Sequence, residues 1–213
     1  MGGVMSSIVV SGDTSGAITI AAPAVAGTNT LTLPANTGTI LTTASGSQSV
    51  PRAAMPAGAI LQVLQTVKTD TFTTTSTTYV DITGFSVSIT PTTSTSKILV
   101  MYNMEIGGSN VADSNHVYLQ LYRNSTAIFT ADTAGSRTSA TSVVNTPTVG
   151  TMYPSNCTYL DSPATTSSVT YKVQIKTSSA SYTACVNRSG RDNDAAAYDG
   201  RAVSSITLME VAA

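Results

Sequence analysis

The residues best suited to chemistry in this chain gather in one short segment near its C-terminal end. Three arginines and three aspartates occur within the fourteen residues from Arg188 to Arg201, although charged residues make up only 10% of the chain. Asp192, Asn193 and Asp194 offer oxygen ligands for Ca²⁺, but the segment lacks the glycine and the closing glutamate of an EF-hand loop. Pairing of Arg with Asp, within the loop or across a subunit interface, is the favoured interpretation, with ligand contact and metal binding as alternatives.

Tyrosine is the dominant aromatic residue, with nine copies against three of Phe and none of Trp. Tyr153, Tyr159, Tyr182 and Tyr198 fall in or near segments that read as long loops, where a rigid amphipathic ring suits contact with a sugar or a protein. Packing of each ring against its own domain is the alternative. The candidate ligand or interface residues are therefore Tyr153, Tyr182, Arg188, Arg191, Asp192, Asp194, Tyr198 and Arg201.

Signs of catalysis are missing from the sequence. His116 is the only histidine, which excludes a site built from several histidines, and no Gly-x-Ser-x-Gly or nucleotide-binding glycine motif occurs. His116 alternates with Val117, Leu119 and Leu121, so we expect it to point away from that apolar row. Glycan-cleaving enzymes need paired carboxylates, whereas the 11 acidic residues here are mostly isolated. The sequence thus predicts no catalytic residue, no cofactor and no metal.

Charge and hydropathy exclude further classes. The net charge is −1, and of the ten basic residues only Arg188, Arg191 and Arg201 come close to clustering, so a nucleic-acid surface is not expected. No apolar stretch is long enough to span a bilayer, and the first basic residue is Arg52, so neither membrane insertion nor a signal peptide is expected. Cys157 and Cys185 both fall in probable strands, where a disulfide is geometrically possible and buried free thiols are favoured.

The elements that must position these residues are predicted to be strands. Thr occurs 37 times and Ser 28 times, and both are weak in helix interiors, while β-branched Thr suits a pleated surface. Apolar residues recur at alternate positions, which argues against disorder. The clearest strands are Ile60 to Val67, Tyr79 to Ile82, Phe85 to Ile89, Lys97 to Ile106, His116 to Tyr122, Ala127 to Thr130, Val169 to Ile175, Tyr182 to Val186 and Val203 to Val211.

Two kinds of strand can be told apart. Strict alternation in Phe85 to Ile89 and in Val169 to Ile175 predicts half-buried antiparallel strands. The segment Ile98 to Tyr102 is continuously apolar, so we expect it to be covered on both sides, either by the second sheet and a loop or by a neighbouring subunit. About nine such strands without a credible helix predict an all-β chain with an antiparallel β-sandwich of jelly-roll type.

The first fifty residues differ from the rest, because they contain no Lys or Arg and a single acid, Asp13. Their short apolar runs cannot bury enough surface to fold alone. An intertwined trimeric stem, a peptide docked into a larger assembly and a flexible arm are the options. We expect residues 1–50 to be this anchoring segment, 51–58 a Pro/Gly linker and 59–213 the sandwich. The candidate anchor residues are Ile8, Val10, Ile18, Ile20, Leu31, Leu33, Ile40 and Leu41.

Several segments together resemble a known family. Thr30-Leu31-Thr32-Leu33-Pro34 with Gly38-Thr39-Ile40-Leu41, and the junction from Gln48 to Gly58, resemble the N-terminal parts of bacteriophage tail fibres and related virion proteins. Phe85 to Pro91 followed by Ser96-Lys97-Ile98-Leu99-Val100 is similar to the β-rich domain of those proteins. Later landmarks are Tyr159 to Pro163, Tyr171 to Gln174, Asn187 to Ser189 and Ser204 to Val211.

The resemblance covers nearly the whole chain, but its motifs are structural rather than catalytic. It implies a virion component, commonly a homotrimer, of the short-fibre type found among phages of aquatic bacteria, including cyanobacteria. On this interpretation residues 1–50 contact other virion proteins, and the sandwich recognises a glycan or protein on the host surface after assembly in the host cytoplasm. A capsid decoration, cement or head-fibre protein is the alternative, since a long repetitive shaft is missing.

Overall fold

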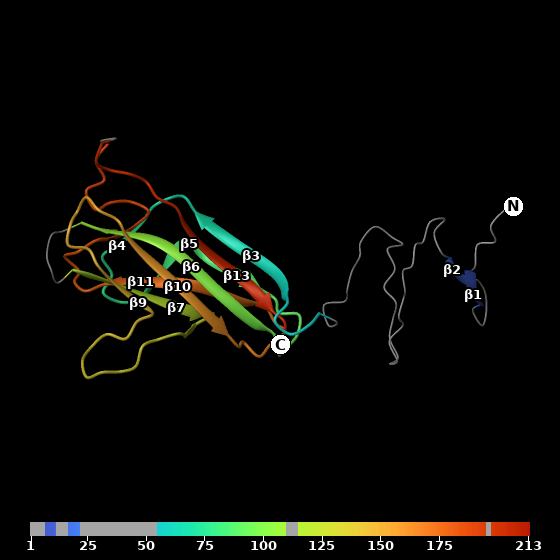
Figure 1. The fold of residues 1–213 in the computed structure, drawn as a ribbon. Coiled ribbons are helices and arrows are strands. Elements are labelled where there is room, and N and C mark those ends of the chain that lie inside the picture. The colour runs from blue at the N-terminus through green and yellow to red at the C-terminus, as the bar shows by residue number, and fades with distance from the viewer. Residues whose placement is uncertain (1–6, 12–16, 22–54, 110–114, 195–196) are drawn as a thin grey trace. The chain divides into compact units, whose positions relative to one another are not determined.

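A computed structural model describes residues 7–11, 17–21, 55–109, 115–194 and 197–213. The chain divides into two units, Met1–Gln48 and Ser49–Ala213. Every regular element in the described residues is a β-strand, and none of them lies in a helix (Figure 1). The all-β class predicted from the Thr and Ser content is therefore confirmed. Accordingly, the described residues contain no helix with the length and hydropathy needed to cross a membrane.

The described residues of the first unit form one antiparallel pair of strands. β1 (Ser7–Ser11) pairs with β2 (Ala17–Ala21), and Ile8 lies opposite Ile20 while Val10 lies opposite Ile18. Four of the expected anchor residues thus occupy paired positions in this hairpin. The other four, Leu31, Leu33, Ile40 and Leu41, lie outside the described residues, as do residues 51–54 of the expected linker.

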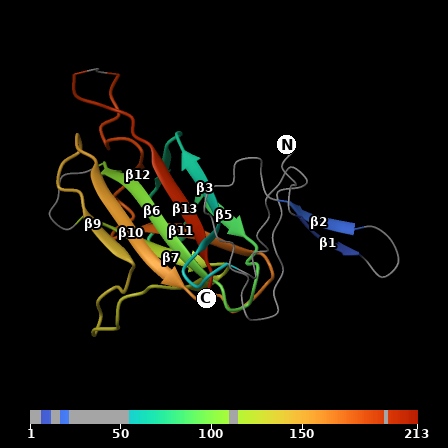
Figure 2. The same cartoon turned by 45° about the vertical axis from the view of Figure 1, so that its right-hand side comes forward.

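The larger sheet of the second unit has the strand order β3-β13-β6-β12-β4, with β10 paired to the other side of β6. All of its pairs are antiparallel. Figures 1 and 2 show β3, β13, β6 and β10 side by side as one broad layer. The strand bounds are β3 Ile60–Lys68, β4 Phe72–Thr74, β6 Lys97–Gly108, β10 Tyr153–Asp161, β12 Ala184–Val186 and β13 Ser204–Val211.

The smaller sheet forms the second layer, with the order β5-β11-β7-β8 and with β9 also paired to β7. Between the two layers lies one apolar core to which both sheets contribute alternate residues. This arrangement confirms the predicted antiparallel β-sandwich. The strand bounds are β5 Val80–Ile89, β7 His116–Arg123, β8 Thr126–Ala127, β9 Ser142–Asn145 and β11 Val169–Thr177.

Alternation along the strands matches the expected pleat. In β11 every second residue from Val169 to Thr177 is buried, and β13 shows the same pattern. Val117, Leu119 and Leu121 of β7 are fully buried while His116 stays half-buried, so the histidine points away from the apolar row as predicted. Cys157 and Cys185 are buried free thiols.

Several predicted strand limits are wrong in instructive ways. The two strands predicted on either side of Gly84 form one strand, β5, because this glycine adopts a φ of 75° and lets the strand continue. The strand predicted from Ala127 to Thr130 ends at Ala127. No strand limits were predicted for β4, β9 or β10, although Cys157 of β10 was expected to lie in a strand. Tyr153 and Tyr159, which were expected in or near long loops, also belong to β10.

A buried polar cluster ties the two sheets together. Asp161 on β10 accepts hydrogen bonds from Arg123 on β7 (2.9 and 2.7 Å) and from the Tyr171 hydroxyl on β11 (2.6 Å). The carboxylate is almost fully buried, but three donor contacts satisfy it. The pKa of Tyr171 is raised, first by burial and then by this hydrogen bond, so its hydroxyl keeps the proton that it donates.

Side chains also close the edge at which β3 and β5 run past each other. Gln62 donates to the Thr90 carbonyl (2.9 Å), Thr66 to the Ser86 carbonyl (2.9 Å) and Lys68 to the Thr83 carbonyl (2.7 Å). All three donors belong to β3 and all three carbonyls to β5 or the residue that follows it. The β5 edge therefore has acceptors that are already occupied.

Candidate functional site

The charged segment near the C-terminus folds into the loop between β12 and β13 (residues 187–203), which we call the recognition loop after the role that we propose for it. Ser204 at the start of β13 pairs with Lys68 at the end of β3, whereas Val211 pairs with Ile60. The Gly58 amide donates to the Ala212 carbonyl. The recognition loop therefore lies at one end of the sandwich and residues 55–59 enter at the other, about 25 Å away along an eight-residue strand.

Asn187 fixes the start of this loop. It adopts a left-handed φ of 62° and is fully buried. Its side-chain amide donates to the backbone carbonyls of Lys68 (2.8 Å) and Asp70 (3.0 Å), and it accepts a hydrogen bond from Ser204 (2.6 Å). Asn tolerates this backbone conformation better than most residues, so one side chain anchors the loop to both neighbouring segments.

Glycines allow the loop to lie directly on the end of β6. A Cβ at Gly190 would overlap the carbonyl of Gly108, and a Cβ at Gly107 would overlap the carbonyl of Arg188. A side chain at Gly108 would collide with Tyr182 and Thr146, whose hydroxyls are hydrogen-bonded to each other. Backbone therefore packs against backbone beneath the loop.

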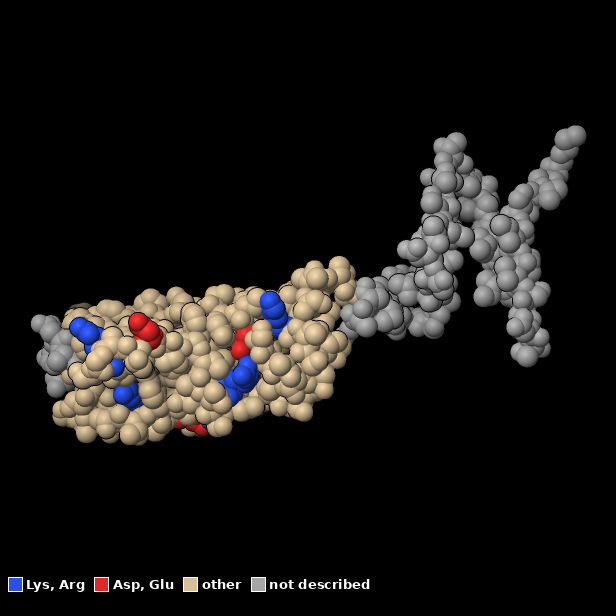
Figure 3. Space-filling view, turned by 90° about the horizontal axis from the view of Figure 1, so that it is seen from below, with Lys and Arg blue, Asp and Glu red and all other residues tan. Residues whose placement is uncertain are grey.

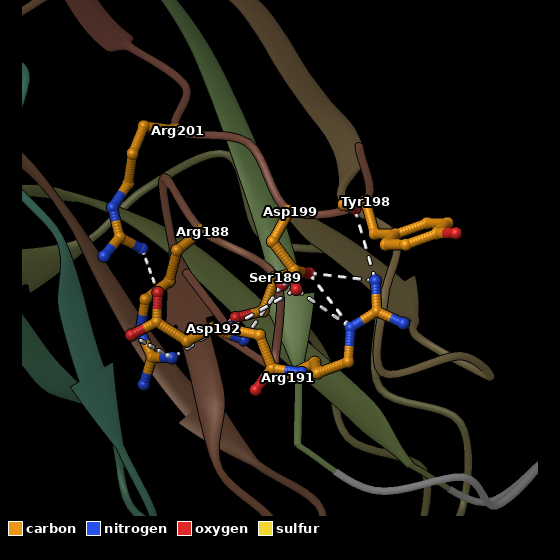
Figure 4. A network of polar contacts seen from close by, with 8 residues as sticks. Arg188, Ser189, Arg191, Asp192, Tyr198, Asp199 and Arg201 are labelled. Carbon is orange, nitrogen blue, oxygen red and sulfur yellow. Dashed lines mark hydrogen bonds and ion pairs between the residues drawn. The ribbon is translucent and has the colours of Figure 1, made fainter. Parts of the chain in front are cut away.

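Two ion-pair clusters organise the surface of the recognition loop (Figure 4). In the first, Arg191 contacts both carboxylate oxygens of Asp199 (3.2 and 2.9 Å through Nε), and Ser189 donates to the same carboxylate (2.7 Å). The Asp199 side chain is only 5% exposed. In the second, Asp192 pairs with Arg188 (3.0 Å) and with Arg201.

The electrostatics of the first cluster favour its charged form. Hydrogen bonds from Arg191 and then from Ser189 lower the pKa of Asp199, while the hydrogen bond to Asp199 raises the pKa of Arg191. In the second cluster the Arg188 and Arg201 backbones form an isolated β-bridge, so two like charges meet across it. Asp192 lies between them and offsets their repulsion.

Tyr198 is the most exposed large side chain of the site, with 73% of its surface accessible. The Arg191 guanidinium lies 5.7 Å from the ring centroid and donates to the Tyr198 carbonyl (3.3 Å). Because Asp199 holds Arg191, the ring rests on a guanidinium that is itself fixed. The outcome is an exposed aromatic ring whose support is ordered before any ligand arrives.

The predicted site residues divide into two groups. Arg188, Arg191, Asp192, Tyr198 and Arg201 come together in the recognition loop as described. The others do not join them: Tyr153 is half-buried on β10 with its hydroxyl beside Thr148, Asp194 is exposed and forms no ion pair within the described residues, and Tyr182 is fully buried. Counting Tyr182 among the ligand contacts was wrong, because its ring fills the core beside Gly108.

Metal binding has no geometric support in the part of the chain that the structure describes. No group of three or more His, Cys, Asp or Glu side chains converges there. Asp192 instead faces two arginines, so its carboxylate already has cationic partners.

Comparisons with known proteins add little to this geometry. No protein-family model matches the chain, and no curated protein matches its sequence. Among solved structures, a chain from the structure of the infectious bursal disease virus Gx strain superposes with a TM-score of 0.37 and 16% sequence identity. That match covers 71% of this chain and 37% of the viral one.

Two important residues of the site escaped the sequence-based candidates. Asp199 lies in the charged segment but is not among the predicted site residues, although it is the most buried acid of the loop. Asn187 entered the sequence analysis only within the segment Asn187 to Ser189 of the family resemblance, because nothing in the sequence around a single Asn predicts a buried left-handed anchor. Only the fold reveals that Lys68 and Asp70 lie beside it.

Proposed function

We propose that this chain is a non-enzymatic structural protein of a bacteriophage particle, a trimeric tail fibre or short spike that displays its sandwich for recognition of the host surface. Residues 1–50 would attach it to other virion proteins, and the recognition loop would meet the host glycan or protein. The observation that carries this proposal is the position of the exposed Tyr198, at the end of the sandwich opposite to residues 55–59.

Surface chemistry supports an assembly protein. Charged residues are sparse in the sequence, and Figure 3 shows one face of the sandwich on which few basic or acidic side chains appear. Such a surface has little charge to keep neighbours apart. The sequence resemblance to phage fibre proteins, together with the charge-poor first fifty residues, supports the virion assignment.

The chemistry of the recognition loop supports binding rather than catalysis. Tyr198 offers a flat ring, and Arg201 offers a guanidinium whose side chain is 58% exposed. The carboxylates of Asp192 and Asp199 pair with arginines, so neither is available as a general acid or base. The guanidinium beside the Tyr198 ring is that of Arg191, and Figure 4 shows Arg201 apart from the ring, on the other side of Asp199. A flat ring and an exposed guanidinium are each suited to a sugar or peptide that carries an anionic group.

Binding of the full-length protein to an array of bacterial surface glycans and to intact bacterial cells would test the recognition role. We expect Tyr198→Ala to lower binding at least tenfold and Phe129→Ala to leave it unchanged. Phe129 is the matched control because it is also exposed (46%) and stacks on Tyr159 at 4.6 Å, near the other end of β10. Equal binding by both variants and the parent would refute recognition through this loop.

A capsid decoration or cement protein is the second candidate, favoured by the same charge-poor first fifty residues. Quantitative mass spectrometry of purified particles distinguishes the two: tens of copies per particle support a fibre or spike, and hundreds support decoration. Native mass spectrometry addresses the stem, because a stable monomer at micromolar concentration would contradict a trimer formed through residues 1–50.

A further inference from the structure

The larger sheet has an outward surface that is unusually apolar. We call it the outer face: the side chains of β3, β13, β6 and β10 that point away from the core. Across these four strands the register aligns Val63 with Met209, Met209 with Leu99, and Leu99 with Leu160. Val63 is 52% and Leu160 45% exposed, and Met209 and Leu99 are partly exposed. One continuous apolar row therefore crosses these four strands, which lie side by side in Figures 1 and 2.

This pattern departs from that of an antiparallel sheet that faces water, whose outward residues are usually polar. The next row is mixed, because Met101 lies there among the polar Gln65, Thr207 and Thr158. Ile60 and Val67 add exposed apolar side chains on β3. The continuously apolar segment of β6 was expected to be covered on both sides, but the described residues cover only its inner side. A partner on the outer face would complete its burial.

Two charges identify that partner. Lys97 and Glu105 are the only charged residues among the outward positions of these four strands, and neither forms an ion pair within the described residues. Both lie on β6, each four residues from Met101 on opposite sides. A twofold axis that crosses the strands above Met101 would place Lys97 of one copy against Glu105 of the next, and the reverse.

We propose that the outer face is a twofold contact with a second copy of this chain, centred on Met101 and closed by two Lys97–Glu105 ion pairs. The axis brings Met101 against its own counterpart and Val63 towards Val67 of the other copy. In this arrangement Lys97 of each copy, about 13 Å from the axis, lies opposite Glu105 of the other copy, and no two like charges face each other. The contact is independent of the proposed recognition loop and of the proposed trimeric stem.

The size of the contact predicts its strength. Four strands about 4.8 Å apart and eight residues long present roughly 500 Å² in plan, which is the scale of a weak interface rather than an obligate one. Such a contact forms only fractionally in dilute solution and is strengthened when copies are held close together by other means. The contact is therefore better detected by covalent cross-linking than by measuring the oligomeric state in solution.

Disulfide trapping with the full-length protein tests the proposal. Met101→Cys places two thiols at the axis, so we expect a disulfide-linked pair to form at least tenfold faster under mild oxidation than for the control Val143→Cys. Val143 is also exposed (49%) but lies on β9 of the other sheet. Thr207→Cys occupies the same row and serves as a second probe, which covers the case that Met101→Cys fails to fold.

Charge reversal tests the pairing. In the Met101→Cys background, Lys97→Glu alone or Glu105→Lys alone should slow trapping several-fold, because each sets like charges together. An equal mixture of the two reversed proteins should restore the rate as cross-linked heterodimers, and so should the double reversal. Trapping no faster than in the Val143→Cys control, or insensitive to every charge reversal, would overturn the proposal, whereas loss of glycan binding would bear only on the proposed function.

Discussion

Individual side chains decide how firmly the recognition loop is held. Asp199 accepts from Arg191, Ser189 and the Asn193 amide at once, whereas Asp194, five residues earlier in the same loop, is exposed. The sequence predicted the loop because charge is concentrated there in a charge-poor chain. It did not predict which acid matters, since burial of Asp199 depends on contacts made by the folded chain.

Replacement of Asp199 should loosen this loop selectively. We expect Asp199→Asn to speed amide hydrogen exchange across residues 188–203 at least several-fold while exchange in β6 and β11 stays unchanged, because Arg191 loses its charged partner. Asp194→Asn is the matched control and should change nothing. Similar exchange rates for the parent and both variants would show that the Arg191–Asp199 pair does not order the loop.

Glu210 gives the protein a pH dependence. It is fully buried on β13, and burial alone would raise its pKa, but hydrogen bonds from Ser96, Thr92 and Gln62 outweigh burial and lower the pKa below the ordinary 4.5. Because the pKa of Glu210 is lower in the folded than in the unfolded state, its ionised form stabilises the folded protein above pH 4.5. This contribution to the free energy of unfolding is lost as the pH falls through the pKa of Glu210 in the folded state.

Glu210→Gln should therefore cost about 1–3 kcal/mol of unfolding free energy at pH 7, and the difference from the parent should shrink below pH 4.5. Urea unfolding at pH 7 and pH 3.5 measures both effects. Glu105→Gln is the control, because that acid is only partly buried on the outer face. A pH-independent difference would show that ionised Glu210 is not the stabilising form.

At the scale of elements, strands that follow apolar alternation were predicted and strands that do not were missed. β11 alternates strictly, and its predicted limits fall within two residues of the observed ones. The limits of β10 could not be predicted from apolar alternation, because its inward positions include the polar Ser155 and Asp161. Their hydrogen-bond partners come from other elements. Pro154 also argues against a strand in the sequence. The folded chain tolerates this proline because β10 pairs only with β6 in the described sheet.

Docking of the recognition loop on β6 depends on glycine. Gly190→Ala should lower the unfolding free energy by about 1–3 kcal/mol, because its methyl group would overlap the Gly108 carbonyl. For a domain of this size that corresponds to a drop in Tm of roughly 2–4 °C per kcal/mol, measurable by calorimetry. Gly200→Ala, in the same loop, should leave the Tm within a degree, since its methyl group would meet only Met152 at 4.0 Å.

At the scale of the whole molecule, the sandwich contains its own core. All residues of the apolar cluster lie between Phe72 and Leu208, within the unit Ser49–Ala213. The sequence indicated this division through the change in charge after residue 50. It indicated only the β6 part of the outer face, through the continuously apolar segment Ile98 to Tyr102, because the rest of that surface arises from the register of four strands that are far apart in the chain.

A protein of residues 55–213 should consequently fold alone. We expect it to unfold in a single cooperative transition, with a Tm within about 2 °C of the main transition of the full chain and equal calorimetric and van't Hoff enthalpies. Retention of that transition together with loss of incorporation into particles would match the proposed anchoring role of residues 1–50. A molten or aggregated fragment would contradict an independent core.

The side chains that close the β3–β5 edge also affect how copies of the domain behave when they are held close together. Sandwiches held near one another present their edges at very high local concentration, where an open edge would recruit a neighbouring strand and lead towards fibrils. Gln62, Thr66 and Lys68 occupy the β5 carbonyls within each copy. The proposed function sets many such domains side by side in a particle, and there the occupied edge would let each domain keep its own sheets. Contacts between copies would then form through faces, as proposed for the outer face, and could separate again.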